Sequence, residues 1–306
     1  MTLPTNPLRK AVQNPRKALN WLRKNGGVET GRGMIDRYLY TPLLARNLFD
    51  TDWDLAIVLD ACRYDTADQR VPMHSIELEQ PESAISVGSH SIDWMRQTFA
   101  HPSSDTLSNI AYITGNPHTE GHLNNDIGLL DEVWRYGWDT DAGTIHPRPI
   151  TDRAIEIGRS KSPERMIVHY MQPHLPPLHE PDYSTAGFEV TGKWIQASPW
   201  ERLRENQLEP ERVIESYEKN LDSVLDEVSL LLSNIDSEKV IVTADHGNYL
   251  GERGRWGHPR GHIHDAVRRV PWFTTKSSDE GTREPDQYNR RKEISIDARL
   301  GALGYR

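Results

Sequence analysis

The chain has 306 residues, of which 36% are hydrophobic and 26% charged, and its formal net charge is −9 at pH 7. This composition predicts a soluble globular protein with enough core for one large α/β domain, and no apolar run approaches the ~20 residues needed to span a bilayer. We expect no nucleic-acid partner, and the single cysteine, Cys62, excludes internal disulfides.

The first fifty residues carry a charge opposite to that of the rest. They hold nine basic and three acidic residues, and Asn14-Pro15 and Gly26-Gly27 delimit a short basic amphipathic helix within them. We therefore expect a basic helical extension over residues 1–50, followed by a globular domain over residues 51–306. The basic front indicates contact with something anionic, either a membrane surface met through residues 1–32 or a charged glycan. An ordinary solvated helix face is the alternative.

The N-terminus shows no export signal. The stretch MTLPTNPLRKAVQNP lacks the apolar core of a signal peptide, and a single cysteine fits a reducing compartment. These two features predict a cytoplasmic location.

The globular part begins with a strand that ends on a carboxylate. After a helix expected over residues 33–48, the segment Trp53–Asp60 contains an apolar run that is typical of a strand buried on both faces. A short strand at 84–87 then leads into Gly88-Ser89-His90-Ser91, and the apolar spacing that follows predicts a helix. Ser91 therefore lies near a helix N-terminus, where free N–H groups and the helix dipole favour an anion.

The second half of the chain repeats the pattern of a buried strand followed by polar residues. Residues 165–171 form one predicted strand, and His174 follows it between prolines. Residues 240–242 form another, followed closely by Asp245 and His246. The other expected elements are, in chain order, a strand at 110–113, a loop-rich segment at 116–150, a helix at 151–159, a lid at 178–208, a helix at 211–232, a late strand at 270–273 and a closing helix at 294–303.

These elements predict one α/β domain with a mostly parallel central sheet and helices on both faces. Chemistry gathers at the carboxyl ends of the strands in such sheets, so Asp60, Asp245 and His246 can offer a cation two hard oxygens and one borderline nitrogen. This ligand set favours Zn²⁺ or Mn²⁺, with Mg²⁺ and Ca²⁺ as alternatives. The structural alternatives are a helix cap for Asp60 and a polar turn for Asp245 and His246.

Five short segments of the chain occur in the same order as the motifs of a known enzyme family. They are VLDACRYD, SVGSHS, HYMQPHLP, VTADHGNYLGE and GHPRG…VPW. Together they resemble the alkaline phosphatase superfamily, most closely its sulfatase-like branch with the phosphoethanolamine and phosphoglycerol transferases. The resemblance covers roughly residues 53–303 and leaves the first fifty residues outside it.

The resemblance implies an alkaline phosphatase-like catalytic domain that hydrolyses or transfers a phosphate or sulfate ester. A divalent cation would activate a hydroxyl, and a covalent seryl intermediate would form and then be resolved. The long lid and the basic front favour a large ester, glycan or lipid linked. The implied roles are metal ligation by Asp60, Asp245 and His246, metal ligation and attack by Ser91, contact with ester oxygens or the leaving group by His174 and His258, and oxyanion contact by Arg63.

The nucleophile has rivals. The family pattern Ser-x-Ala/Gly-Ser-x-Thr, set onto residues 86–91, puts the attacking hydroxyl on Ser91, with Ser86, Ser89 and Cys62 as alternatives. The Cys-x-Pro-x-Arg signature of the formylglycine sulfatases is absent, because Arg-Tyr-Asp follows Cys62. Cys62 is therefore expected to be a small packed residue.

Most of the thirteen histidines have no spacing that singles them out. His262 and His264 lie close to His258 in the sequence and compete with it for the same role. His174, between prolines, has a plain loop residue as its alternative. His169 lies inside an apolar strand, which predicts a core residue rather than a ligand.

Two rival functions stay open. A phosphomutase would need a complete two-metal ligand set, and Tyr170 stands where the two-metal phosphatases place a carboxylate. A catalytically inactive relative would hold a metal or bind a partner without turnover. Turnover of ester substrates, measured together with metal content, would separate the two from the main hypothesis.

Overall fold

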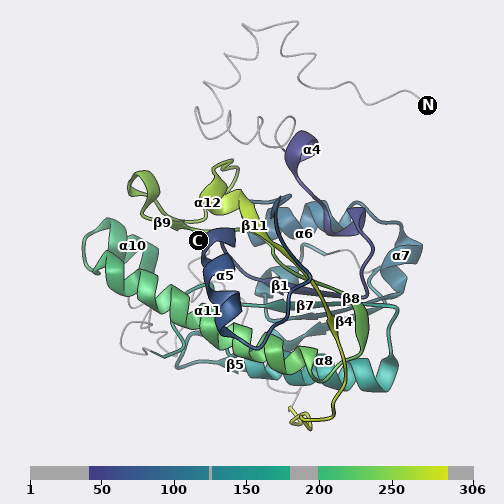
Figure 1. Cartoon of the computed structure of the whole chain (residues 1–306). Coiled ribbons are helices and arrows are strands. Elements are labelled where there is room, and N and C mark those ends of the chain that lie inside the picture. The colour runs from purple at the N-terminus through teal and green to yellow at the C-terminus, as the bar shows by residue number, and fades with distance from the viewer. Residues whose placement is uncertain (1–40, 124–125, 180–198, 289–306) are drawn as a thin grey trace, which may run out of the picture.

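The computed structural model describes residues 41–123, 126–179 and 199–288 (Figure 1). Its centre is a seven-stranded sheet in the order β2-β11-β8-β1-β7-β3-β4. β8, β1, β7, β3 and β4 run parallel, and β11 is antiparallel to both of its neighbours. The mostly parallel sheet is thereby confirmed. The strands are β1 (Leu55–Leu59), β2 (Gln80–Ile85), β3 (Ile110–Thr114), β4 (Leu129–Glu132), β7 (Arg165–Tyr170), β8 (Ser237–Ala244) and β11 (Arg269–Ser277).

Helices cover both faces of this sheet, as β7 shows directly. Tyr170 hydrogen-bonds Thr151 of α8 (Pro147–Lys161) at 2.9 Å. The preceding residue, His169, packs edge-to-face on Trp94 of α6 (Ser91–Phe99). Successive side chains of a strand point to opposite faces, so α8 and α6 lie on opposite sides of the sheet.

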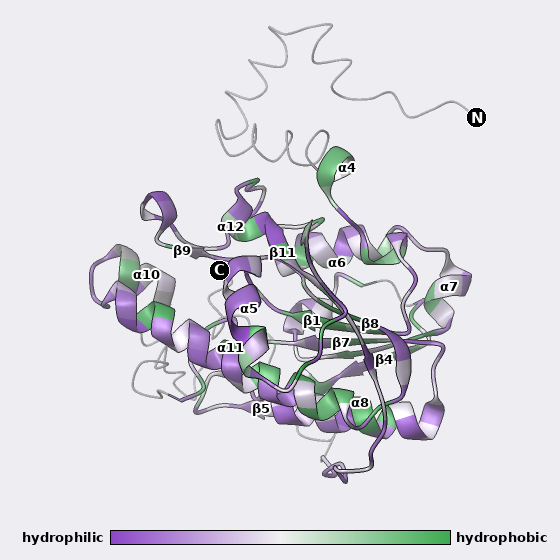
Figure 2. Ribbon diagram, in the orientation of Figure 1, coloured by the Kyte–Doolittle hydropathy of each residue, from purple (hydrophilic) through white to green (hydrophobic). Residues whose placement is uncertain are grey.

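The long helix α11 (Pro210–Leu232) packs against α8 and against α5 (Tyr64–Arg70), and the three are seen together on one side in Figure 1. β1 and β3 are buried over their whole length, because a strand covered on both faces exposes neither side. Figure 2 accordingly shows hydrophobic residues concentrated in the central strands and hydrophilic residues on the outer surfaces of the helices.

A smaller unit sits at the carboxyl end of the sheet. β9 (Tyr249–Leu250) and β10 (Trp256–Gly257) form a hairpin, and α10 (Pro199–Arg204) packs on it through a separate apolar cluster around Trp200. In the part of the chain that the structure describes, the other helices are α4 (Thr41–Leu44), α7 (Ser104–Ser108) and α12 (Asp265–Arg268), and a second hairpin joins β5 (Trp138–Asp139) to β6 (Thr144–Ile145). The same residues contain 3-10 turns at Leu48–Asp50, Val71–Met73, Pro117–Thr119, Val133–Arg135 and Glu252–Gly254.

The helix predicted at 33–48 ends earlier than we expected. α4 stops at Leu44, and Asn47 has extended backbone angles and caps the 3-10 turn at Leu48–Asp50 with its side chain. Asparagine favours such caps over helix interiors because its side chain competes for backbone N–H groups.

The segment at 116–150, which we expected to be loop-rich, also contains short elements that we did not predict. It contains β4, the edge strand of the sheet. Only Asp131 of its four residues is buried, so the strand shows no continuous apolar run. α8 also begins at Pro147 instead of Thr151, since proline suits the first turn of a helix. The predicted N-terminal basic helix, the closing helix at 294–303 and most of the lid at 178–208 lie outside the described residues.

Candidate metal centre and active site

The carboxyl ends of β1 and β8 bring three ligating side chains together. The two strands pair in parallel with Leu59 opposite Ala244, so Asp60 and Asp245 follow them side by side. Oxygens of these carboxylates and a nitrogen of His246 lie within 4.8 Å of one another, and all three side chains are fully buried. His246 Nε2 is 3.6 Å from Asp60 Oδ1 and 3.4 Å from Asp245 Oδ2.

Backbone hydrogen bonds orient Asp245 and His246 toward each other. Asp245 Oδ1 accepts from the N–H groups of Ala61 and His246 at 3.1 and 2.8 Å, whereas its Oδ2 has no hydrogen-bond partner in the described part of the chain. His246 Nδ1 lies 2.8 Å from the carbonyl oxygen of Gly247 and donates its proton there, which leaves a lone pair on Nε2. A cation bound between buried carboxylates and an imidazole lone pair would offset the cost of burying them. The residues therefore fit a divalent metal ion.

The hydroxyl of Ser91 lies at the same centre. Its Oγ is 3.4 Å from Asp60 Oδ2 and 3.3 Å from His246 Nε2, and the side chain is fully buried. Ser91 is the first residue of α6, and the preceding His90 caps this helix by accepting from the N–H of Ile92. The hydroxyl thus lies where the dipole of α6 favours negative charge.

The rival nucleophiles have other contacts. Ser86 Oγ donates to the backbone carbonyl of Asp245, and Ser89 Oγ donates to a backbone carbonyl at 3.1 Å. Cys62 is fully buried, and burial raises the pKa of its thiol, so the reactive thiolate is disfavoured at neutral pH. Ser91 is the candidate whose side chain contacts the ligand cluster.

His174 and His258 lie beside the centre and contact each other. Their Nε2 atoms are 2.9 Å apart, and the His258 ring stacks on that of His246 with centroids 4.4 Å apart. His174 Nδ1 contacts the carbonyl of Leu175, so Nδ1 carries the proton and Nε2 accepts from His258. Burial, reinforced by neighbouring imidazoles, lowers the pKa of His174 to about 4 and that of His258 well below its usual value. Both rings are therefore neutral at pH 7.

The competing histidines have other partners. His262 lies 3.2 Å from the Tyr249 hydroxyl, and His264 caps α12 by accepting from the N–H of Ala266. His258 is the member of this group that stacks on a ligand candidate.

Two histidines that the sequence analysis did not single out complete the cluster. The His90 ring lies 5.3 Å from the rings of both His118 and His258 and stacks on His246 at 6.2 Å. Burial and neighbouring imidazoles lower the pKa of His118 to about 3 and that of His90 well below its usual value. Neutral imidazoles thus surround the centre on several sides.

Asn116 also escaped the sequence analysis. Its Nδ2 donates to Asp60 Oδ2 at 2.7 Å, and its Oδ1 accepts from the backbone N–H of His118 at 2.9 Å. One signal was present: both residues follow β3, which runs parallel to β7 and therefore ends at the edge of the sheet where the ligands gather.

Arg63 is held by carboxylates. Its guanidinium forms two bonds to Asp65, one to Glu252 and one to the backbone carbonyl of Asn248. Through these four donor contacts Arg63 ties the loop after β1 to the turn that follows β8. The expected oxyanion contact of Arg63 stays a prediction.

The turn that carries Asp245 and His246 is tightly packed at Gly247. A Cβ atom there would lie 2.3 Å from the carbonyl oxygen of Ala266 and 3.3 Å from Val267 Cα. We expect Gly247→Ala to destabilise the fold by about 1–3 kcal/mol and to weaken metal binding, because the adjacent ligands must shift. Thermal melting with and without Zn²⁺ measures both effects. Gly121→Ala is the control: a Cβ atom there has nothing within 4 Å, so this substitution carries only the backbone cost of its positive φ. Equal effects of the two substitutions would contradict the packing argument.

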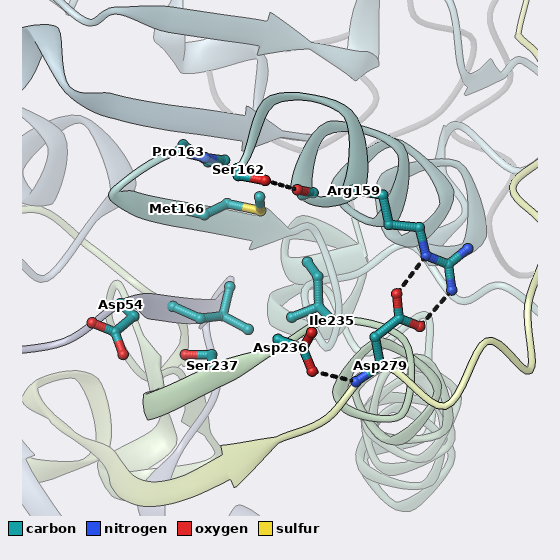
Figure 3. A pocket seen from close by; sticks show the side chains of 11 residues that line it. Asp54, Arg159, Ser162, Pro163, Met166, Ile235, Asp236, Ser237 and Asp279 are labelled. Atoms are coloured by element: carbon teal, nitrogen blue, oxygen red, sulfur yellow. Dashed lines mark hydrogen bonds and ion pairs between the residues drawn. The ribbon is translucent and has the colours of Figure 1, made fainter.

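A cavity of about 450 Å³ lies at the other end of the strands (Figure 3). Met166 and Ser237 line it from the beginnings of β7 and β8. Its polar groups are largely engaged with one another: Asp279 makes two 2.7 Å contacts with Arg159, and its backbone N–H donates to Asp236 at 2.9 Å. This cavity is separate from the metal centre and shares none of its ligands.

Comparison with known proteins gives one family and a set of structural neighbours. A family model described as Sulfatase matches residues 87–291. The chain is similar to the integral membrane protein lipooligosaccharide phosphoethanolamine transferase A from Neisseria meningitidis, with 12% identity, coverage of 89% of this chain and 60% of that one, and a TM-score of 0.51. No curated protein matches the chain.

Two further neighbours are C-terminal periplasmic domains of phosphoethanolamine transferases called EptC. The domain from Campylobacter jejuni has 14% identity, coverage of 74% of this chain and 79% of that one, and a TM-score of 0.48. The domain from Escherichia coli, in complex with Zn, has 10% identity, coverage of 84% and 83%, and a TM-score of 0.49.

The predicted cytoplasmic location is wrong, because the neighbour from Neisseria meningitidis, with a TM-score of 0.51, is an integral membrane protein. The prediction rested on a single cysteine and on an N-terminus without an apolar core. Neither feature is diagnostic, since a domain with a large core needs no disulfide in any compartment. Within the described residues, no helix combines the length and the apolar character that a bilayer crossing requires.

Proposed function

The chain belongs to the sulfatase family, within the alkaline phosphatase superfamily, and from that premise we propose that it is a metal-dependent enzyme that hydrolyses or transfers a phosphate or sulfate ester through a covalent seryl intermediate. The observation that carries the proposal is the position of the Ser91 hydroxyl, 3.4 Å from Asp60 and 3.3 Å from His246. We place the catalytic domain at residues 51–306 and a basic helical extension at residues 1–50.

Asp60, Asp245, His246 and Ser91 are the proposed metal ligands. A divalent cation bound there would lower the pKa of the serine hydroxyl and neutralise charge on the transferred group. Zn²⁺ is our first choice because it accepts mixed nitrogen and oxygen ligands, and Mn²⁺ is the second. Asn116 supports this set by donating to Asp60 Oδ2 at 2.7 Å.

The remaining chemistry is assigned to the residues around the hydroxyl. Ser91 Oγ forms a bond to phosphorus or sulfur as the bond to the leaving oxygen breaks, and the proton lost by Ser91 balances the one that the leaving oxygen gains. Water or an acceptor hydroxyl then takes the group from Ser91. His174 and His258, neutral because burial lowers the pKa of each, are assigned contact with the ester oxygens or the leaving group. The N–H available for such a contact is that of His258 Nε2, which would turn from His174 Nε2 to the substrate.

A phosphomutase has less support. The position that carries a second-site carboxylate in the two-metal relatives is Tyr170, whose hydroxyl hydrogen-bonds Thr151 of α8 on the face of the sheet opposite α6. Inactivity remains the contrasting hypothesis, and a direct assay decides it.

The test combines metal analysis with an ester panel. The purified chain is assayed with an aryl phosphate, an aryl phosphodiester and an aryl sulfate, after chelation and after reloading with Zn²⁺, Mn²⁺, Mg²⁺ or Ca²⁺. We expect metal-dependent turnover of at least one substrate, and an added alcohol acceptor distinguishes transfer from hydrolysis. A tightly bound metal without turnover of any ester would favour the inactive relative, and turnover that resists chelation would contradict the metal mechanism.

Residues 1–32 are proposed to contact an anionic membrane surface, which fits a substrate linked to a lipid or glycan. The support is the excess of basic residues in this part of the sequence. Deleting residues 1–32 should leave turnover of a small aryl ester within a few-fold and weaken binding to phosphatidylglycerol vesicles, and the wild-type binding should fade with added salt. Neutral vesicles are the control. A truncated chain that is folded but inactive would contradict the proposal that residues 1–32 are not needed for turnover.

A further inference from the structure

His169 and Tyr112 form a buried contact to which the proposed function assigns no role. His169 lies in β7 between Val58 of β1 and Thr114 of β3, and its side chain is fully buried. Its Nδ1 is 2.8 Å from the Tyr112 hydroxyl, and its ring packs edge-to-face on Trp94 with centroids 5.4 Å apart. Contacts from β3 and α6 therefore fix the orientation of this imidazole.

The other ring nitrogen of His169 faces Asp245. His169 Nε2 is 3.8 Å from Asp245 Oδ2, and neither atom has a hydrogen-bond partner among the described residues. Asp245 Oδ1 is already held by two backbone N–H groups. The second oxygen therefore lies between two imidazoles, those of His169 and of His246 at 3.4 Å.

Tyr112 determines which nitrogen of His169 carries the proton. Burial raises the pKa of Tyr112 well above its usual value, so its hydroxyl stays protonated and can donate to Nδ1, 2.8 Å away. The single proton of the neutral ring then lies on Nε2. The opposite tautomer would set the lone pairs of His169 Nε2 and Asp245 Oδ2 against each other in a buried site, which is unfavourable.

We propose that His169, oriented by Tyr112, is a positioning residue for Asp245: its Nε2–H faces Oδ2 and fixes the rotation of the carboxylate toward the cation. The inference rests on the proposed metal ligation by Asp245. A separation of 3.8 Å exceeds a hydrogen bond, so His169 acts through the attraction between its N–H and the carboxylate oxygen. Groups that orient a metal ligand without touching the metal typically contribute about 10- to 100-fold to metal affinity or activity.

The test measures Zn²⁺ affinity of the full chain by competition with a chromophoric chelator, alongside aryl ester turnover. His169→Phe keeps an aromatic ring without nitrogen and should weaken Zn²⁺ binding about 10- to 100-fold. His169→Gln supplies an amide N–H close to the position of Nε2 and should retain most of the affinity. Tyr112→Phe removes the hydroxyl that sets the tautomer; it should cause an intermediate loss alone and no further loss in the His169→Phe background.

Phe99→Leu is the matched control. Phe99 packs on Trp94 and Tyr112 in the same aromatic cluster, so the substitution should lower the melting temperature and leave Zn²⁺ affinity unchanged. Wild-type affinity in His169→Phe, or equal losses in His169→Phe and His169→Gln, would overturn the proposal. If His169→Phe does not fold, unchanged affinity in Tyr112→Phe overturns it equally. A wild-type chain that binds neither Zn²⁺ nor Mn²⁺ would instead contradict the proposed function.

Discussion

Ser91→Ala is expected to lower turnover of an aryl ester by at least about three orders of magnitude. The substitution removes the oxygen that, in the proposed function, bonds to phosphorus or sulfur. Zn²⁺ affinity should fall only a few-fold, because the two carboxylates and the imidazole of the ligand cluster remain. Alanine is also well tolerated in a helix, so α6 should still form. Steady-state kinetics with metal in excess, together with chelator competition, separate the two effects.

The rival nucleophiles provide the controls for this prediction. Ser89→Ala and Cys62→Ser should each cost far less activity, because Ser89 donates to a backbone carbonyl and Cys62 is a buried thiol with a raised pKa. Peptide mass spectrometry of the chain quenched during turnover should find phosphate or sulfate on Ser91. Phosphate or sulfate found on Ser89 or Cys62 would show that another residue attacks. A Ser91→Ala variant with near wild-type activity would show the same.

The convergence of Asp60, Asp245 and His246 could be predicted from the sequence because two independent signals agree. An apolar run that is buried on both faces identifies a central strand, and parallel strands end at the same edge of the sheet. The polar residues after β1 and β8 are therefore neighbours although they lie far apart in the chain, as the pairing of Leu59 with Ala244 shows.

Other parts of the site depend on loop paths that no periodicity encodes. Asn116 and His118 reach the centre through the 3-10 turn that follows β3, within a segment that we expected only to be loop-rich. The carboxylate partners of Arg63 could not be predicted for a related reason. A charged residue near a strand end can face either a substrate or other charges, and the choice depends on where Asp65 and Glu252 lie in space.

The cellular location and the edge strand β4 could not be predicted from composition and local sequence pattern. A cysteine count is only a default, and the location that it predicted differs from that of the integral membrane neighbour. β4 was missed because a short edge strand needs little apolar surface: only Asp131 of its four residues is buried, and that carboxylate is paired with Arg153 of α8. A polar edge stabilised by an ion pair gives no signal in an apolar pattern.

Asp245→Asn is expected to abolish turnover and to weaken Zn²⁺ binding by more than the ~100-fold typical of groups that orient a metal ligand without touching the metal. Asparagine keeps an oxygen for the N–H groups of Ala61 and His246, which now bond Oδ1 at 3.1 and 2.8 Å, but it removes a charge that the cation needs. The metal-free variant should melt at or above the metal-free wild type, because a buried carboxylate without a cation is costly.

The sharpest readout of this variant is its melting temperature with and without metal. A ligand that binds only the folded state stabilises it by about 2.7 kcal/mol at a hundredfold excess over Kd, so Zn²⁺ or Mn²⁺ should raise the melting temperature of the wild type and leave that of Asp245→Asn almost unchanged. Asp152→Asn is the matched control: this fully buried carboxylate pairs with Arg283 at 2.8 Å and accepts from Tyr288 at 2.8 Å. It should melt earlier but keep the full response to metal. If chelation changes neither the melting temperature nor the activity of the wild type, the proposed metal centre is refuted.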